Sequence, residues 1–434
     1  MADEFKQRRQ RLMRQLGKDA AAVFVSGQEA LRNGDVDYPF RQDSAFYYLT
    51  GFEEPSSIAV LRPGSEHPYT LLVRPHDPQM AVWVGPRAGV DGAVERYGAD
   101  QAFPIEELQE RLHELLKDVT TVWFSLGGSS HTEAVLTALV ASRRAMSQRG
   151  AKPIEAVRDP EPLVDELRLL KSPAEVRDLQ RAIDITGKGL DAAMRATRPG
   201  MHEYEVQATL EGVYRREGAV RDGFPTIAAS GPNSCTLHYT TNRRQLQDGD
   251  LMLLDTGAEW GYYSADVTRT YPANGRFTSA QRDVYEVVLA AQANGIDRAR
   301  PGQRFHDAHD AAVRTLVEGL IDLKVLRGSV DSLIEQDAYR HVYMHSTSHW
   351  LGLDVHDAGR YRAGDQSIPL RPGMVLTVEP GLYFAPGTKG VPKRLQGIGI
   401  RIEDDILVTK EGNRNLSGRI PSAPDDLEAI VGSR

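Results

Sequence analysis

The chain has 434 residues, of which 41% are apolar and 26% charged, with a formal net charge of −8. A chain of this length exceeds one ordinary core, so we expect two domains. Acids and bases are interspersed in a globular composition, which argues against the basic patch of a nucleic-acid-binding protein. Cys235 is the single cysteine, which excludes an intramolecular disulfide.

Residues 1–17 have the charged pattern of an amphipathic helix. This segment lacks the apolar core of a signal peptide, and no later stretch is long enough to span a bilayer. We therefore expect a cytoplasmic protein without a membrane segment.

Residues 1–165 alternate short apolar runs with helical patterns, which predicts an α/β domain. Buried strands are expected at 20–27, 56–64, 68–75 and 120–127, and amphipathic helices at 105–118 and 132–150. The Gly-Gly-Ser-Ser run at 127–130 is not followed by the lysine of a phosphate-binding loop, so we interpret it as a turn. This domain contains no obvious catalytic motif.

A second domain is predicted over 166–434, because prolines and then a strong helix start follow residue 160. Ser172 supplies an N-cap hydroxyl, Pro173 takes the first helical position and Glu175 the third. Helices are expected at 173–197, 203–218 and 279–299. The chain becomes strand-like and rich in glycine after the second of these helices.

Two segments of this domain, 248–257 and 371–381, have the same spacing of glycines around a carboxylate. In each, an apolar run delivers a carboxylate, Asp255 or Glu379, with one glycine six residues before it and another two residues after it. If this internal repeat reflects the structure, it implies two related halves across a pseudo-two-fold axis. Each half would then donate acids to a central cleft.

Segment 253–272 predicts two neighbouring strands joined by a turn. Asp255 lies near the end of the first strand and Asp266 early in the second, so both side chains can address one spot. Any one aspartate at a strand end is more often a turn former than a ligand.

Strand periodicity separates the acids of segment 397–405. Its three isoleucines are predicted to form the buried face, with Arg401 and Glu403 on the opposite face. Asp404 then points away from Glu403. A solvated edge charge is the alternative interpretation of any one acid here.

Four of the 12 histidines gather in two segments: His345, His349 and His356 in 345–357, and His238 in 234–241. If the four selected carboxylates converge with one histidine, they repel strongly at low dielectric. Two divalent cations cancel four negative charges, and metal pairs about 3.5–4 Å apart recur in hydrolytic sites. The single-zinc motif HExxH is absent. Spacing alone leaves a metal centre and unrelated charges equally open.

Segments 253–270, 345–357, 375–383 and 399–405 together resemble the proline-specific members of the pita-bread metallopeptidases, the aminopeptidase P group. The resemblance extends to segment 40–55 and so covers most of the chain. It implies an α/β N-terminal domain followed by an α+β pita-bread (creatinase/aminopeptidase) domain with pseudo-two-fold halves. It also implies a metallo-aminopeptidase that hydrolyses the N-terminal Xaa-Pro bond of peptides with water activated by two metal ions.

Carried over to this sequence, the resemblance implies five metal ligands: Asp255, Asp266, His349, Glu379 and Glu403. Glu403 would bridge the two ions. Manganese is the metal that the resemblance suggests, although zinc, cobalt or iron can also occupy an oxygen-rich shell with one imidazole.

The resemblance further implies that Glu379 shuttles the proton of the attacking water and that His356 hydrogen-bonds the scissile carbonyl. His238, His345 and Arg401 would line the site that receives proline and the downstream peptide. Arg401 would also orient Glu403 from the same strand face. For His238 and His345 a structural role is the alternative, and for Arg401 a role only as an ion-pair partner.

Trp83 resembles an N-domain tryptophan that reaches the active site of a neighbouring subunit in bacterial relatives, with a buried core tryptophan as the alternative. The resemblance suggests homodimers or homotetramers. The nearest competing activity is prolidase, a dipeptidase of the same fold. Methionine aminopeptidase usually lacks such an N-domain, and metal-free creatine amidinohydrolases and non-enzymatic interaction proteins or histone chaperones of this fold lack the ligand set.

Overall fold

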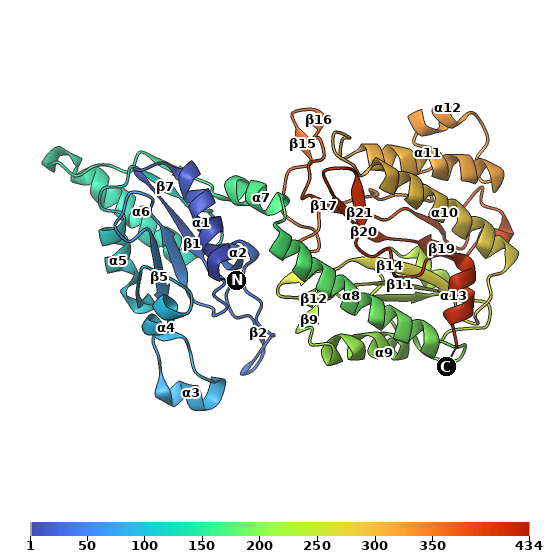
Figure 1. Ribbon diagram of the computed structural model, residues 1–434, viewed down its shortest axis with the longest axis horizontal. Coiled ribbons are helices and arrows are strands. Elements are labelled where there is room, and N and C mark those ends of the chain that lie inside the picture. The colour runs from blue at the N-terminus through green and yellow to red at the C-terminus, as the bar shows by residue number, and fades with distance from the viewer. Residues whose placement is uncertain (1, 434) are drawn as a thin grey trace. The chain divides into compact units, whose positions relative to one another are not determined.

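The computed structural model describes residues 2–433, which form two compact units that divide after Leu167 (Figure 1). This division lies within helix α7 (Glu161–Leu169), as does the predicted boundary between residues 165 and 166. Among the described residues, no helix is both long and apolar enough to cross a membrane.

The first unit contains one mixed sheet. Its strands are β1 (Ala20–Val25), β4 (Ile58–Leu61), β5 (Tyr69–Val73), β6 (Gln101–Pro104), β7 (Thr121–Trp123) and β8 (Ala156–Arg158). They lie in the order β6-β5-β4-β1-β7-β8, where β1 pairs antiparallel with β4 and parallel with β7. The four predicted strands are all present. β6 and β8 were not predicted, because both are short edge strands without fully buried residues.

The first unit also contains several helices and a small hairpin of β2 (Leu31–Asn33) and β3 (Val36–Asp37). The helices are α1 (Ala2–Leu16), α2 (Ser44–Thr50), α3 (Pro78–Val84), α4 (Gly89–Glu95), α5 (Leu108–Leu115) and α6 (Ser130–Ala145). Leu112 of α5 and Leu136 of α6 pack with Val23 and Val60 of the sheet in one apolar core. The two glycines of the Gly-Gly-Ser-Ser run lie in a turn, Ser129 is the N-cap of α6 and Ser130 is the first residue of that helix.

The second unit carries the helices α8 (Pro173–Ala196), α9 (Glu203–Arg216), α10 (Ser279–Arg298), α11 (Asp307–Asp322), α12 (Val330–Glu335) and α13 (Pro424–Ile430). The strands of its first half are β9 (Arg221–Asp222), β10 (Ile227–Ser230), β11 (Leu251–Thr256), β12 (Ala258–Trp260), β13 (Tyr263–Ser264) and β14 (Val267–Pro272). Those of its second half are β15 (Arg362–Ala363), β16 (Gln366–Ser367), β17 (Val375–Val378), β18 (Gly381–Phe384), β19 (Ile398–Arg401), β20 (Asp404–Val408) and β21 (Asn413–Asn415).

The two halves repeat one plan. In each, a pair of helices, α8 with α9 or α10 with α11, precedes an antiparallel three-stranded sheet, β10-β11-β14 or β17-β20-β21. Figure 1 shows the first helix pair below the central strands and the second pair above them. Both leading helices begin with a capping box, Ser172 with Glu175 and Thr278 with Gln281. The predicted capping box is confirmed, and the structure has the repeated halves that the internal repeat implied.

The prediction of two strands over 253–272 was incomplete, because β12 and β13 lie between β11 and β14. Gly261 and Tyr262, at φ 57° and 71°, form the left-handed turn that joins β12 to β13. Gly257 is required before this hairpin, since a Cβ there would lie 1.7 Å from the backbone oxygen of Ala265. The hairpin still returns the chain so that β11 and β14 pair directly.

The prediction of one buried face for segment 397–405 was also incomplete. Ile400 and Ile402 are fully buried, but Arg401 and Glu403 are only 3% and 1% exposed. The alternation therefore separates an apolar core from a buried polar centre rather than from solvent.

Candidate active site

The second unit contains a cavity of about 1070 Å³. It is lined by nine of the ten predicted site residues: His238, Asp255, Asp266, His345, His349, His356, Glu379, Arg401 and Glu403. The tenth, Trp83, belongs to α3 of the first unit and is 82% exposed, which rules out the buried core tryptophan. The four selected carboxylates thus meet around one space.

Strand ends deliver these carboxylates. Asp255 is the penultimate residue of β11 and pairs with Thr268 of β14, while Asp266 immediately precedes β14. Glu379 follows the last residue of β17, and Glu403 lies between β19 and β20. The two halves are joined here, since the Glu403 N–H donates to Thr268 O at 3.2 Å.

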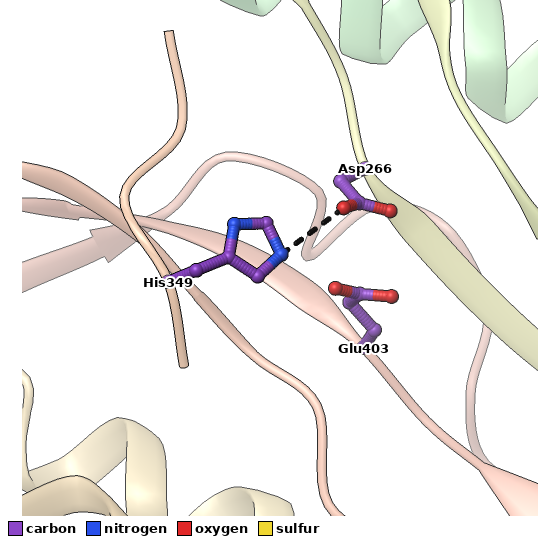
Figure 2. Close-up of side chains that lie close together, drawn as sticks. All are labelled: Asp266, His349 and Glu403. Carbon is purple, nitrogen blue, oxygen red and sulfur yellow. Dashed lines mark ion pairs between the residues drawn. The ribbon is translucent and has the colours of Figure 1, made fainter. Parts of the chain in front are cut away.

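Asp266, His349 and Glu403 form the tightest cluster, with candidate ligand atoms that all lie within 4.8 Å of one another. Figure 2 shows the imidazole of His349 facing the two carboxylates. His349 Nε2 lies 3.3 Å from Asp266 Oδ2 and 3.4 Å from Glu379 Oε1. One imidazole and several carboxylates suit a divalent cation.

The orientation of His349 also suits a ligand. Its Nδ1 lies 3.0 Å from Trp350 O, and because a carbonyl only accepts, Nδ1 carries a proton. Nε2 therefore faces the oxygens of Asp266 and Glu379. Lone pairs at these distances need a cation or a proton between them. A backbone carbonyl that fixes the other nitrogen is the usual support of a metal-binding histidine.

Burial makes the acids costly to ionise. Burial, followed by the charges of Asp255 and Asp405, raises the pKa of Asp266 well above its usual range. Burial also raises the pKa of Glu403, with Asp266 and Glu379 adding to the effect. For Glu379, burial raises the pKa against the opposing effect of His349. Divalent cations would relieve this repulsion.

Arg401 pairs directly with Asp255 and reaches Glu403 through a hydroxyl group, since Arg401 Nε donates to Thr268 Oγ1 at 3.3 Å and this hydroxyl donates to Glu403. The orientation of Glu403 by Arg401 stays a prediction. Arg401 Nη2 donates to Asp255 Oδ2 at 2.5 Å, and Nη1 donates to the Tyr383 hydroxyl at 2.9 Å. The other oxygen of Asp255, Oδ1, is buried and has no hydrogen-bond partner among residues 2–433. An orphaned carboxylate oxygen in a cluster of potential ligands fits direct bonding to a cation.

Two hydroxyl groups without a predicted role hold Glu403 and Glu379. Thr268 Oγ1 donates to Glu403 Oε2 at 2.6 Å, and Thr377 Oγ1 donates to Glu379 Oε1 at 3.4 Å. A period-two signal could have found Thr377, which lies two residues before Glu379 on the same segment, but not Thr268, whose partner Glu403 is 135 residues away. Tyr383 had no such signal, since its contact with Arg401 depends on the pairing of β18 with β19.

His356 and His345 line the same cavity but have different contacts. The His356 ring lies 4.3 Å from that of His349, and burial, then His349 and His238, lowers its pKa. Both nitrogens of His345 have protein partners, Ser346 O and the Tyr383 hydroxyl, each at 2.8 Å. Burial, followed by the charge of Arg401, lowers the pKa of His345 to about 3.

Comparison with known proteins relates both units of the chain to metallopeptidases. Residues 177–410 match the model of metallopeptidase family M24, and residues 5–123 match that of the aminopeptidase P N-terminal domain. A curated relative, the Xaa-Pro aminopeptidase of Escherichia coli K12, is 41% identical over 430 residues, which cover 99% of this chain and 97% of that protein.

Two solved structures extend the likeness to the backbone. The aminopeptidase PepP of Pseudomonas aeruginosa has a TM-score of 0.97 at 41% identity, over 99% of this chain and 98% of that one. Escherichia coli aminopeptidase P with the inhibitor Pro-Leu has a TM-score of 0.95 at 41% identity, with the same coverage. The α/β and pita-bread fold class expected above is confirmed.

Proposed function

Because the chain belongs to metallopeptidase family M24, in its aminopeptidase P group, we propose that it hydrolyses the N-terminal Xaa-Pro bond of peptides. The observation that carries this proposal is the convergence of four carboxylates and His349 around one cavity. The second unit, predicted over 166–434, would be the catalytic domain, and the α/β domain over 1–165 would precede it.

We infer two divalent cations per chain, with manganese as the first choice and zinc, cobalt or iron as alternatives. Three features support the fit: the unpartnered Asp255 Oδ1, the orientation of His349 and the crowding of acids. The proposed ligands are Asp255, Asp266, His349, Glu379 and Glu403. When bound, such cations supply a nucleophilic hydroxide near neutral pH and polarise the substrate carbonyl.

The remaining chemistry falls to the protein side chains. Glu379 faces the cavity and would take the proton of the attacking water, then pass it to the leaving proline nitrogen. His356 would donate a hydrogen bond to the scissile carbonyl oxygen as negative charge develops there. Arg401 would hold Asp255 in place, and His238 and His345 would form the wall against which the peptide lies.

Proline explains why a specialised enzyme is needed. The Xaa-Pro bond is a tertiary amide without an N–H, so a peptidase that recognises this N–H by hydrogen bonding loses the contact. A specialist must instead accept the ring and recognise the free N-terminus. The Escherichia coli relative in complex with Pro-Leu supports a proline-accepting site in the same fold.

The proposal is tested with Xaa-Pro-Xaa peptides, with and without exhaustive EDTA treatment and with added manganese. We expect release of the first residue, loss of this activity on chelation, and recovery with manganese. Cleavage that survives complete removal of metal would contradict the dinuclear mechanism.

Prolidase activity is the second candidate, since the ligand blocks suit both enzymes. The name of the Escherichia coli relative favours the aminopeptidase. Parallel assays on Xaa-Pro and Xaa-Pro-Xaa separate the two, because a strict dipeptidase does not cleave the longer peptide. Elemental analysis of protein purified without chelator should give about two metal ions per chain, whereas a metal-free creatinase-like enzyme or interaction protein would give none.

Assembly and location complete the proposal. We propose a homodimer or homotetramer in the cytoplasm, in which the exposed Trp83 approaches the cavity of another subunit. Light scattering on wild type and Trp83→Ala tests the assembly. A monomeric wild type of full activity would contradict the role of Trp83.

A further inference from the structure

A buried cluster of charges lies at the beginning of the second unit, beside the proposed ligands but separate from them. Lys171 Nζ donates to Asp357 Oδ2 at 2.9 Å, and both side chains are 1% exposed. Arg168 Nη2 donates to the other oxygen, Oδ1, at 2.5 Å. Asp357 lines the cavity and directly follows His356 in the chain.

This ion pair supports the loop 350–357, which connects His349 to His356. A Cβ on Gly352 would lie 2.1 Å from Asp357 Oδ2 and 3.0 Å from Lys171 Cε, so the loop backbone packs directly on the pair. The oxygen of Gly352 accepts from Ser264 N at 2.9 Å, two residues before Asp266. Loop 350–357 is thereby fixed at its centre.

The same loop is closed at its ends. Trp350 O accepts the Asp357 N–H at 2.9 Å and also lies 3.0 Å from the protonated Nδ1 of His349. One carbonyl therefore sets both the ring of His349 and the backbone beside His356. The positively charged side chains of Lys171 and Arg168 keep the buried Asp357 ionised, because they lower the pKa of its carboxyl group against the effect of burial.

We propose that Lys171 and Asp357 are positioning residues, whose buried ion pair holds loop 350–357 so that His356 reaches the scissile carbonyl. This inference rests on the proposed function. Neither residue touches the reacting atoms, and both act through His356. A misplacement of about 1 Å at such a group is enough to cost about a hundredfold in rate.

The test is a mutant cycle with His356. Lys171→Met keeps the length of the side chain, removes its charge and leaves Asp357 paired with Arg168. We expect kcat on an Xaa-Pro-Xaa peptide to fall about tenfold with KM changed by less than about twofold. In a His356→Ala background, measured with single turnovers at high enzyme concentration, the same substitution should change kcat by less than about twofold.

Asp357→Asn and the double variant Lys171→Met/Asp357→Asn provide independent routes if one variant folds poorly. The double variant should lose about as much kcat as Asp357→Asn alone, because Asp357→Asn already removes the charged partner of Lys171. Asp354→Asn is the matched control, since Asp354 also pairs with Arg168 but is 40% exposed. It should keep wild-type kcat. Metal content and circular dichroism should equal those of wild type in every variant compared.

An equal loss in the wild-type and His356→Ala backgrounds, or no loss at all, would overturn the inference. An inactive wild type would instead overturn the proposed function. The two failures are therefore distinct.

Discussion

The central strands of the two units are buried to a similar degree, yet they carry different side chains. β1 and β4 of the first unit are apolar throughout, and their residues join one core with α5 and α6. β14 of the second unit is fully buried as well, but it contains Thr268, Arg269 and Thr270. Burial alone therefore does not distinguish a core from a reactive centre.

The difference lies in how the buried polar groups are satisfied. Arg269 donates to Asp404 and to four backbone oxygens, those of Thr268, Glu403, Ile420 and Pro421. A network of this kind is stable only when every member has a partner. Asp255 Oδ1 is one of the buried oxygens without a hydrogen-bond partner among residues 2–433, and it lies where we propose the cations. Among the described residues, the one cluster of three potential ligands lies in the second unit.

The largest effect is expected from a substitution in the polar centre of the second unit that removes activity and leaves the fold intact. Glu403→Gln should lower kcat by at least about a thousandfold, or about 4 kcal/mol, because it removes the charge of a proposed metal ligand. Without metal, the melting temperature should stay equal or rise, because one repelling charge is gone. Peptide assays and thermal melts with chelator measure both. Lower stability in chelator would contradict the repulsion argument.

The opposite pattern is expected from the apolar core of the first unit. Leu112→Ala should cost about 2–5 kcal/mol of unfolding free energy, since Leu112 is fully buried between α5 and the sheet. The kcat per folded molecule should stay at the wild-type value at a temperature where the variant is folded. Urea titration and peptide assays on one preparation provide the comparison.

A pH effect should separate the half-buried His309 of α11 from the exposed His341. Burial, then His306 and Arg340, lowers the pKa of His309 to about 4, below the usual value of about 6.5 for an unfolded chain. The unfolded state then binds more protons between these values, so His309 costs stability as pH falls through this window.

The free energy of unfolding of His309→Gln should therefore rise by about 2 kcal/mol relative to that of wild type when the pH drops from 7 to 5. Urea titration at the two pH values measures the change. His341→Gln, at an exposed histidine, is the control and should follow wild type. A constant difference between His309→Gln and wild type would refute the prediction.

The smallest effects on stability are expected from the helix N-caps, which allow the two halves of the second unit to be compared. Ser172→Ala and Thr278→Ala each remove the N-cap hydroxyl of a leading helix, and each should cost about 1 kcal/mol. The two losses should add, because the caps belong to separate helices. Thermal melts of the single and double variants test this. Strongly unequal losses would show that the halves are not energetically alike.

The amino-acid sequence by itself determined the features that depend on local order. The N-cap of α8, the strands β1, β4 and β5, and the carboxylates at the ends of β11 and β17 all follow from patterns within a few residues. The ligand candidates also belonged to recognisable short segments, so they could be selected from the sequence, and nine of the ten site residues line one cavity.

Tertiary structure alone decided which partners these residues meet. Arg401 pairs with Asp255 rather than Glu403, and Lys171 reaches Asp357 across 186 positions of the chain. The β12–β13 hairpin and the contact of Tyr383 with Arg401 likewise depend on pairings that no local period records. The physical reason is that periodicity fixes the face a side chain takes, whereas the packing of distant strands and loops fixes what lies opposite that face.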